Sequence, residues 1–187
     1  MENMMKSVCR FLLAGAALLS TAGSVSAAPL SETPEGVLYE GNVVSGAQVI
    51  HSYEPLKASG EATPSTERAA NKAVIAHFFE LPIGEERARL YADDGVKQIP
   101  SMGVQWIGLD AQLKNNKQNE TLFPGWTWAK VVIWDTSDPT VFWVEAEGRT
   151  GAGRIPAYSN HYVMQMVAKG GKIVLFREFG TPLTLTK

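Results

Sequence analysis

The residue best suited to proton chemistry is Glu178, on a predicted strand near the C-terminus. Counting in steps of two places it on one strand face with Phe176 and Val174. A carboxyl group among apolar side chains has a raised pKa, which suits general acid or base catalysis near neutral pH. A rim glutamate paired with an arginine or lysine is the alternative interpretation, and periodicity alone favours it.

The preceding predicted strand offers a second set of polar and apolar side chains. Its alternation places Tyr158, Asn160, Tyr162, Met164 and Met166 on one face. Tyrosine, asparagine and methionine suit the wall of a ligand site. They suit an ordinary core face almost as well, because methionine fills irregular gaps and buried tyrosine finds a hydrogen-bond partner.

Other kinds of site are not favoured by residue spacing. His77 is followed by Glu80 three residues later, but His51 and His161 bring no further ligand at a recognisable spacing, so we expect no metal. The glycine-rich stretch that begins at Gly148 opens no helix, so we interpret it as a hairpin loop at a cavity mouth rather than a phosphate cradle. No nucleophile-elbow signature is present, and no cofactor is expected.

The N-terminus has the features of a signal peptide over residues 1–27. Lys6 and Arg10 precede a short apolar run, and Val25-Ser-Ala27 suits cleavage. The only cysteine, Cys9, lies inside this segment, so a mature disulfide or thiolate nucleophile is excluded. We therefore expect a periplasmic or secreted protein without integral membrane association, since the apolar run is too short to span a bilayer.

Composition and charge limit the number of domains and the kinds of partner. The 187 residues carry a net charge of −2 with 45% hydrophobic and 19% charged residues, which indicates one globular domain plus an extension. No clustered basic surface is apparent, so nucleic acid is not an expected partner. Residues 28–64, rich in proline, serine and glycine, are predicted to be a mostly irregular arm before a domain over residues 65–187.

The domain is predicted to contain three helices followed by strands. Ser65 or its neighbours cap the first helix, Asp93-Asp-Gly95 ends the second with a turn, and Asp110 starts the third. The helices are expected over residues 65–81, 85–92 and 108–122, and the strands over residues 96–99, 104–107, 127–134, 140–147, 158–167 and 172–179. This order indicates an α+β fold, a curved, mostly antiparallel sheet that three helices close into a cone around a cavity.

An ordered series of short motifs resembles the PhzA/PhzB family of phenazine biosynthesis, within the SnoaL-like, NTF2-like superfamily. The motifs are LFPGWTW (122–128), WDTSDP (134–139), VFWVEAEG (141–148), NHY (160–162), and GKI (171–173) with REF (177–179). The resemblance covers roughly residues 68–183 and implies the NTF2-like cone. It also implies a cavity in which two aminocyclohexenone-type molecules condense through imine formation.

The same resemblance assigns roles to individual residues. It places the acid/base glutamate of the family at Glu178, a substrate-binding arginine at Arg87 and a pocket tyrosine at Tyr158. The pocket histidine and serine of the family are replaced here by Asn115 and Asn119. Asparagine can form hydrogen bonds but cannot titrate, so a step that needs an imidazole proton shuttle is lost.

Our leading hypothesis is an exported cone whose cavity binds a small carboxylated or carbonyl-bearing molecule. In a cofactor-free condensation, cyclisation or isomerisation, Glu178 would move a proton, Arg87 would clamp an anionic group, and Tyr158 with Asn115 or Asn119 would polarise a carbonyl. Asn160 and Tyr162 complete the predicted binding set.

The alternative hypothesis is a non-catalytic ligand-binding or dimeric assembly module. A homodimer through the sheet is expected, because Trp128, Trp134 and Trp143 lie on strands that offer apolar surface. The same tryptophans also suit a buried core.

Overall fold

The computed structural model describes residues 30–39, 41–52, 60–151 and 158–182. The predicted signal peptide at residues 1–27 lies outside the described residues. Among the described residues, no helix has the length and apolar content needed to cross a bilayer.

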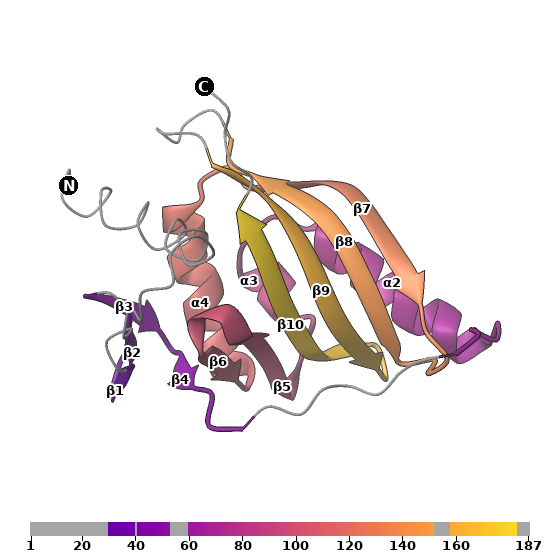
Figure 1. Cartoon of the computed structure of the whole chain (residues 1–187), viewed down its shortest axis with the longest axis horizontal. Helices are drawn as coiled ribbons and strands as arrows, with labels where there is room; N and C mark the ends of the chain where they lie inside the picture. The colour runs from indigo at the N-terminus through magenta and orange to yellow at the C-terminus, as the bar shows by residue number, and fades with distance from the viewer. Residues whose placement is uncertain (1–29, 40, 53–59, 152–157, 183–187) are drawn as a thin grey trace, which may run out of the picture.

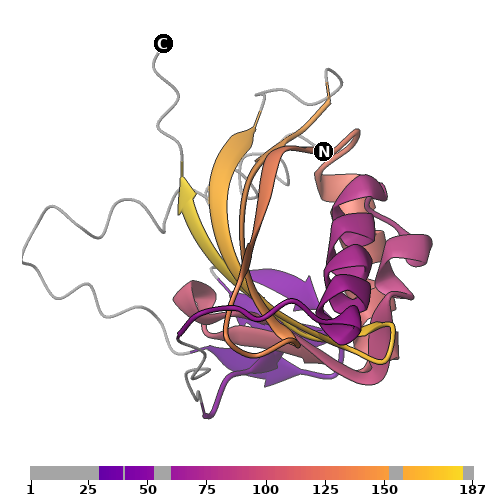
Figure 2. The same ribbon diagram turned by 90° about the vertical axis from the view of Figure 1, so that its right-hand side faces the viewer.

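A seven-stranded curved sheet forms the body of the molecule, with the helices on its concave side (Figures 1 and 2). Across the sheet, the strands are β4 (Gln48–Val49), β6 (Val104–Ile107), β5 (Tyr91–Ile99), β10 (Lys172–Pro182), β9 (Ser159–Lys169), β8 (Val141–Arg149) and β7 (Thr127–Asp135). The pairing of β5 with β10 is parallel and the other pairings are antiparallel. The helices are α2 (Thr66–Glu80), α3 (Glu85–Ala88) and α4 (Leu109–Leu122), and η2 (Pro100–Met102) is a 3₁₀ turn. The predicted α+β cone is confirmed.

Helix α2 begins where predicted, and its buried face includes two polar side chains. Ser65 is its N-cap, with its hydroxyl accepting the backbone N–H of Arg68 at 3.1 Å. The buried face carries Ile75, Phe78 and Phe79 together with Arg68 and Asn71. The polar pair was not expected inside; both side chains donate to backbone carbonyls of residues 137–139, between β7 and β8. These bonds anchor the helix to the sheet.

The segment after α2 differs from the prediction. Helix α3 ends at Ala88, and Asp93-Asp-Gly95 lies inside β5 instead of forming a turn. Pairing with β10 extends the strand back to Tyr91, and Gly95 permits the close approach, because a Cβ there would lie 2.8 Å from the Ile173 carbonyl oxygen. Helix α4 starts after Gly108, which has a φ of 86°, and not at Asp110.

The prediction of an irregular arm is wrong for residues 31–49. They form a three-stranded meander, β1 (Ser31–Thr33), β2 (Gly36–Tyr39) and β3 (Asn42–Ser45), followed by β4. Val37 and Val44 pack in a second core with Val104 and Trp106. The Trp106 indole donates to the Ser45 carbonyl at 2.9 Å. This buried tryptophan supplies the apolar area that the short strands lack.

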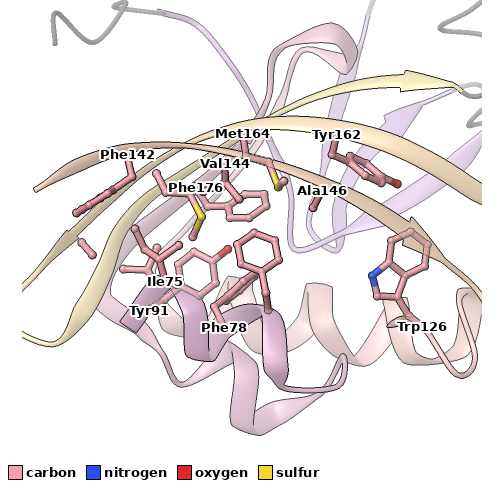
Figure 3. Packing of buried hydrophobic residues seen from close by; sticks show 14 residues of the cluster. Ile75, Phe78, Tyr91, Trp126, Phe142, Val144, Ala146, Tyr162, Met164 and Phe176 are labelled. Atoms are coloured by element: carbon pink, nitrogen blue, oxygen red, sulfur yellow. The ribbon is translucent and has the colours of Figure 1, made fainter. Parts of the chain in front are cut away.

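The main core lies between the helices and the concave face of the sheet. Phe78 and Tyr91 face Phe176 of β10 beneath Val144 and the other inward-facing residues of β8 and β9 (Figure 3). The alternation predicted for β9 is confirmed, with Asn160, Tyr162, Met164 and Met166 all buried.

On β10, an irregularity between Ile173 and Leu175 interrupts the predicted alternation. Ile173 and Phe176 are both buried in the core, so Val174 does not share the face of Phe176 and Glu178.

Candidate functional site

A cavity of about 360 Å³ lies between the sheet, α3, α4 and the N-terminal meander. Its lining is largely aromatic and aliphatic, and among the described residues that line it three are charged: Arg87, Lys97 and Glu178. The full lining consists of Asn42, Val43, Val44, Phe78, Ile83, Arg87, Tyr91, Lys97, Ile99, Met102, Trp106, Asn115, Asn116, Gln118, Asn119, Leu122, Phe123, Trp126, Trp128, Tyr162, Phe176 and Glu178. A few polar groups in an apolar hollow are typical of a small-molecule site.

Glu178 reaches the cavity from β10, two residues after Phe176, as predicted. Burial raises its pKa above the ordinary value of 4.5, and the positive charges of Lys97 and Arg87 oppose that rise. The side chain keeps some accessible surface because it faces the cavity, while protein atoms surround it. Desolvation therefore dominates, and Glu178 has the environment of an acid/base group.

Arg87 projects into the same cavity from α3 and is 6% exposed. Its Nε donates to Asn116 Oδ1 at 3.4 Å, and its guanidinium carbon lies 5.0 Å from the centre of the Phe78 ring. Burial lowers its pKa to about 10, so the side chain remains charged at neutral pH. Its Nη1 has no hydrogen-bond partner among the described residues. This buried cation is available to an anionic ligand group.

Lys97 is a third charged residue, which was not predicted from the sequence. Its Nζ donates to Asn115 Oδ1 at 3.2 Å and lies 4.9 Å from the centre of the Trp106 ring. Burial lowers its pKa, while the charge of Glu178 raises it and that of Arg87 lowers it. The available signal was a lysine within a short predicted strand that also contains Gln98, and an exposed strand would show the same sequence.

Helix α4 contributes a row of amides to the cavity. Asn115 is buried, and its Oδ1 accepts hydrogen bonds from Lys97 and from Asn119 Nδ2, the latter at 3.3 Å. Asn116 accepts from Arg87 and donates to the Gln112 carbonyl. The predicted Asn115 and Asn119 therefore line the cavity, and Asn115 and Asn116 also hold the two cations in place.

Of the three residues predicted at or next to β9, one lines the cavity and two lie outside its lining. Tyr162 lines the cavity and is 5% exposed, and its hydroxyl lies 3.1 Å from that of Tyr158. Tyr158 is not part of the lining; its ring stacks on Trp126 at 5.9 Å. Asn160 is buried and also lies outside the lining. Of the two tyrosines, it is therefore Tyr162 that lines the cavity, and burial raises the pKa of its hydroxyl, so that the hydroxyl stays protonated.

The glycine-rich segment has a packing role at its start. Gly148 lies in β8, and a Cβ there would be 2.0 Å from Trp126 Cζ2. Trp126 lines the cavity, so Gly148 makes room for one of its walls. Gly153 and Pro156 lie outside the described residues, and so does most of the predicted hairpin loop.

The histidines do not gather into a ligand set. His77 Nδ1 is 3.4 Å from Glu80 Oε2 on the exposed side of α2, and His161 Nε2 is 3.0 Å from Glu145 Oε1. Within the described ranges, no group of three or more His, Cys, Asp or Glu side chains is placed to hold a metal ion.

Comparison with known proteins shows a family match over most of the chain. Residues 56–186 match the family Phenazine biosynthesis protein A/B. Phenazine biosynthesis protein PhzA of Pseudomonas fluorescens is 42% identical over 133 residues, which cover 62% of this chain and 77% of that protein. Phenazine biosynthesis protein PhzA1 of Pseudomonas aeruginosa is 41% identical over 127 residues, covering 62% of this chain and 78% of that protein.

Solved structures agree on the fold. A phenazine biosynthesis-related protein of Pseudomonas aeruginosa superposes with a TM-score of 0.56 at 23% identity, covering 65% of this chain and 92% of that chain. An NTF2-like protein of Anabaena variabilis superposes with a TM-score of 0.55 at 13% identity, covering 66% and 97%.

Proposed function

Since the chain belongs to the phenazine biosynthesis protein A/B family, we propose that its cavity binds a small molecule carrying a carboxylate and a carbonyl. We propose further that it converts this molecule by cofactor-free acid/base chemistry, as a condensation, cyclisation or isomerisation. The observation that carries this proposal is the charge pattern of the cavity: two buried cations and one carboxyl group of raised pKa in an otherwise apolar hollow.

The cations support an anionic ligand. The cavity has two basic side chains, Arg87 and Lys97, and one carboxyl group, Glu178. Its net charge is therefore positive when all three are ionised. A ligand carboxylate would offset the cost of burying these charges, and the unpaired Nη1 of Arg87 offers it a donor. At about 360 Å³ the cavity suits a small molecule, near the lower end of the range for ligand pockets.

Glu178 supports the proton-transfer step. As a protonated acid it can donate to a ligand oxygen, and as a carboxylate it can remove a proton from carbon next to a carbonyl. Tyr162 can donate a hydrogen bond to a developing oxyanion from the same wall. Asn115 and Asn119 cannot titrate, so proton movement in this cavity falls to Glu178 rather than to α4.

Calorimetric titration with 3-oxocyclohexane-1-carboxylate tests the ligand class. We expect Arg87→Met to weaken binding by at least about tenfold, since a charge-assisted hydrogen bond contributes roughly 1.5–3 kcal/mol. Arg89→Met is the matched control, because Arg89 is exposed and its side chain pairs with Glu85. Equal affinity in wild type and Arg87→Met, or no binding by the folded wild type, would contradict the proposal.

A non-catalytic module that binds a ligand or forms a dimer is the second candidate. The exposed surface of the sheet supports the dimer. Val132, Trp134 and Val163 are exposed, with Trp134 57% accessible, on the face away from the core. Trp143 is partly buried beside Phe179, and Trp128 lines the cavity. We propose that the outer face pairs two copies, with Trp134 as the anchor.

We also propose that the protein is exported. The support is the sequence order of a basic start, an apolar run and a small-residue cleavage motif over residues 1–27. Amino-terminal sequencing of protein recovered from its own host tests this, with a start at residue 28 as the expected result and an intact N-terminus as the contrary one.

A further inference from the structure

Lys97 places a primary amine in the same cavity as the proposed acid/base group. Building on the proposed function, we propose that Lys97 Nζ is a nucleophile that forms an imine with the carbonyl carbon of a bound ketone or aldehyde. The site is then covalent as well as acid/base, and its substrates are carbonyl acids rather than carboxylic acids in general.

The position of Nζ is defined by several groups. It donates to Asn115 Oδ1, and the rings of Trp106 and Phe176 lie 4.9 and 5.8 Å away, measured to their centres. A lysine on a flexible stem is thereby held in one region of the cavity wall. A fixed amine beside a bound carbonyl has the orientation that intramolecular reactions exploit.

The strand register brings the acid/base partner next to it. In the parallel pairing of β5 and β10, Lys97 lies opposite Phe176, and Glu178 follows two residues later on the same face. Each of Lys97, Glu178 and Arg87 has a pKa that is shifted by the charge of at least one of the other two. Burial lowers the pKa of the Lys97 amine, which increases the fraction of the neutral form that attacks a carbonyl.

The step balances without an oxidant or reductant. The lone pair of the neutral amine attacks the carbonyl carbon, forming the C–N bond, and the former carbonyl oxygen takes the proton that the nitrogen loses, which gives a neutral carbinolamine. Protonated Glu178 then donates a proton to the hydroxyl, which leaves as water while the nitrogen lone pair forms C=N. Overall, one ketone, the neutral lysine amine and protonated Glu178 give one protonated imine, one water and the Glu178 carboxylate.

The protonated imine explains why an amine and a carboxyl would share this cavity. It withdraws electrons from the neighbouring carbon more strongly than the ketone does, so Glu178, now a carboxylate, can remove a proton there. Arg87 can hold the ligand carboxylate meanwhile. Hydrolysis by the reverse sequence releases the product and restores the lysine.

Reductive trapping tests the assignment. Wild-type protein is incubated with 3-oxocyclohexane-1-carboxylate and sodium cyanoborohydride, and intact-mass and peptide mass spectrometry locate the adduct. We expect one adduct on Lys97, none on Lys97→Met or Lys97→Arg, and normal labelling of Lys117→Met, which removes an exposed lysine of α4. Labelling spread over exposed lysines, or an adduct that persists on the folded Lys97→Met variant, would overturn it.

A second ligand separates this inference from the proposed function. Cyclohexanecarboxylate carries the anion without the carbonyl, and its calorimetric binding reports the cavity alone. Binding of both acids with no trapped adduct overturns the imine and leaves anion binding intact. Failure of the folded protein to bind either acid overturns both. Glu178→Gln should bind yet form the adduct at least about tenfold more slowly, because general acid catalysis is worth roughly 10²–10⁴-fold.

Discussion

Burial of Glu178 makes its ionised form unfavourable for the folded state. Its pKa is raised in the native state, so the folded protein holds this proton more tightly than the unfolded chain does. The stability that this proton contributes is present below the ordinary pKa of 4.5 and is lost as pH rises through the raised value. The carboxylate is therefore a destabilising group near neutral pH.

The Glu178→Gln variant should remove this pH dependence. We expect its thermal midpoint to match wild type near about pH 4 and to exceed it above the raised pKa, measured by calorimetry up to about pH 8. Glu86→Gln, at an exposed position of α3, serves as the control and should track wild type. A midpoint of Glu178→Gln well below wild type at neutral pH would mean that Glu178 is a structural ion-pair partner.

The sequence predicts some residues of the candidate site and not others. The family resemblance is what predicted both Glu178 and Arg87, because periodicity alone favours a glutamate at the cavity rim. Lys97 was not predicted, because its burial depends on Trp106 and on β10. Both are too far from Lys97 in the sequence to appear in a local pattern. Strand alternation places Tyr158 and Tyr162 on the same face. Only the packing of Tyr158 against Trp126 shows that Tyr162 is the one that lines the cavity.

Strands β6 to β10 match their predicted ranges closely, because β-branched and aromatic runs separated by turn residues give a strong local signal. The misses arise where pairing overrides local preference. Residues 91–95 become strand through contact with β10, the arm becomes a meander through Trp106, and one irregularity in β10 changes which residues share a face.

Helix α2 is held by polar bonds that its pattern did not reveal. Arg68 is 6% exposed and donates to the carbonyls of Thr63, Ser137 and Asp138. We expect Arg68→Met to lower the free energy of unfolding by about 1–3 kcal/mol, because buried carbonyls lose their donors. Urea denaturation measures the change. The exposed Arg89→Met should stay within about 0.5 kcal/mol, and a similarly small effect of Arg68→Met would show that these bonds do not anchor the helix.

Strand β8 makes room for a cavity wall at Gly148. An alanine there would place its Cβ against the Trp126 indole, so we expect Gly148→Ala to displace Trp126 and destabilise the fold by about 1–3 kcal/mol. Tryptophan fluorescence and thermal unfolding report the two effects. Gly170→Ala is a control without steric contact, although its φ of 59° itself costs about 1 kcal/mol. Unchanged fluorescence in Gly148→Ala would contradict the packing role.

At the scale of the molecule, the sheet has two different faces. The helices lie on its concave side (Figure 2), where the cavity is enclosed. The outer face exposes Val132, Trp134 and Val163. Because the two faces are separate, substitutions on the outer face should leave the cavity unchanged, whether or not two copies pair there.

The Trp134→Glu variant tests that separation. If two copies pair through the outer face, light scattering should show a dimer for wild type and a monomer for the variant at tens of micromolar, since a charge at a buried interface centre is strongly unfavourable. Ligand affinity should remain the same. A wild-type monomer at that concentration would contradict the dimer.

If Glu178 moves protons on a bound carbonyl acid, the carbons next to the carbonyl must exchange hydrogen with the solvent. Deuterium exchange at the carbons next to the ketone of 3-oxocyclohexane-1-carboxylate, followed by NMR in heavy water, measures this directly. We predict exchange with wild type at least about 100-fold faster than with Glu178→Gln. Exchange at equal rates with the two folded proteins would contradict the account.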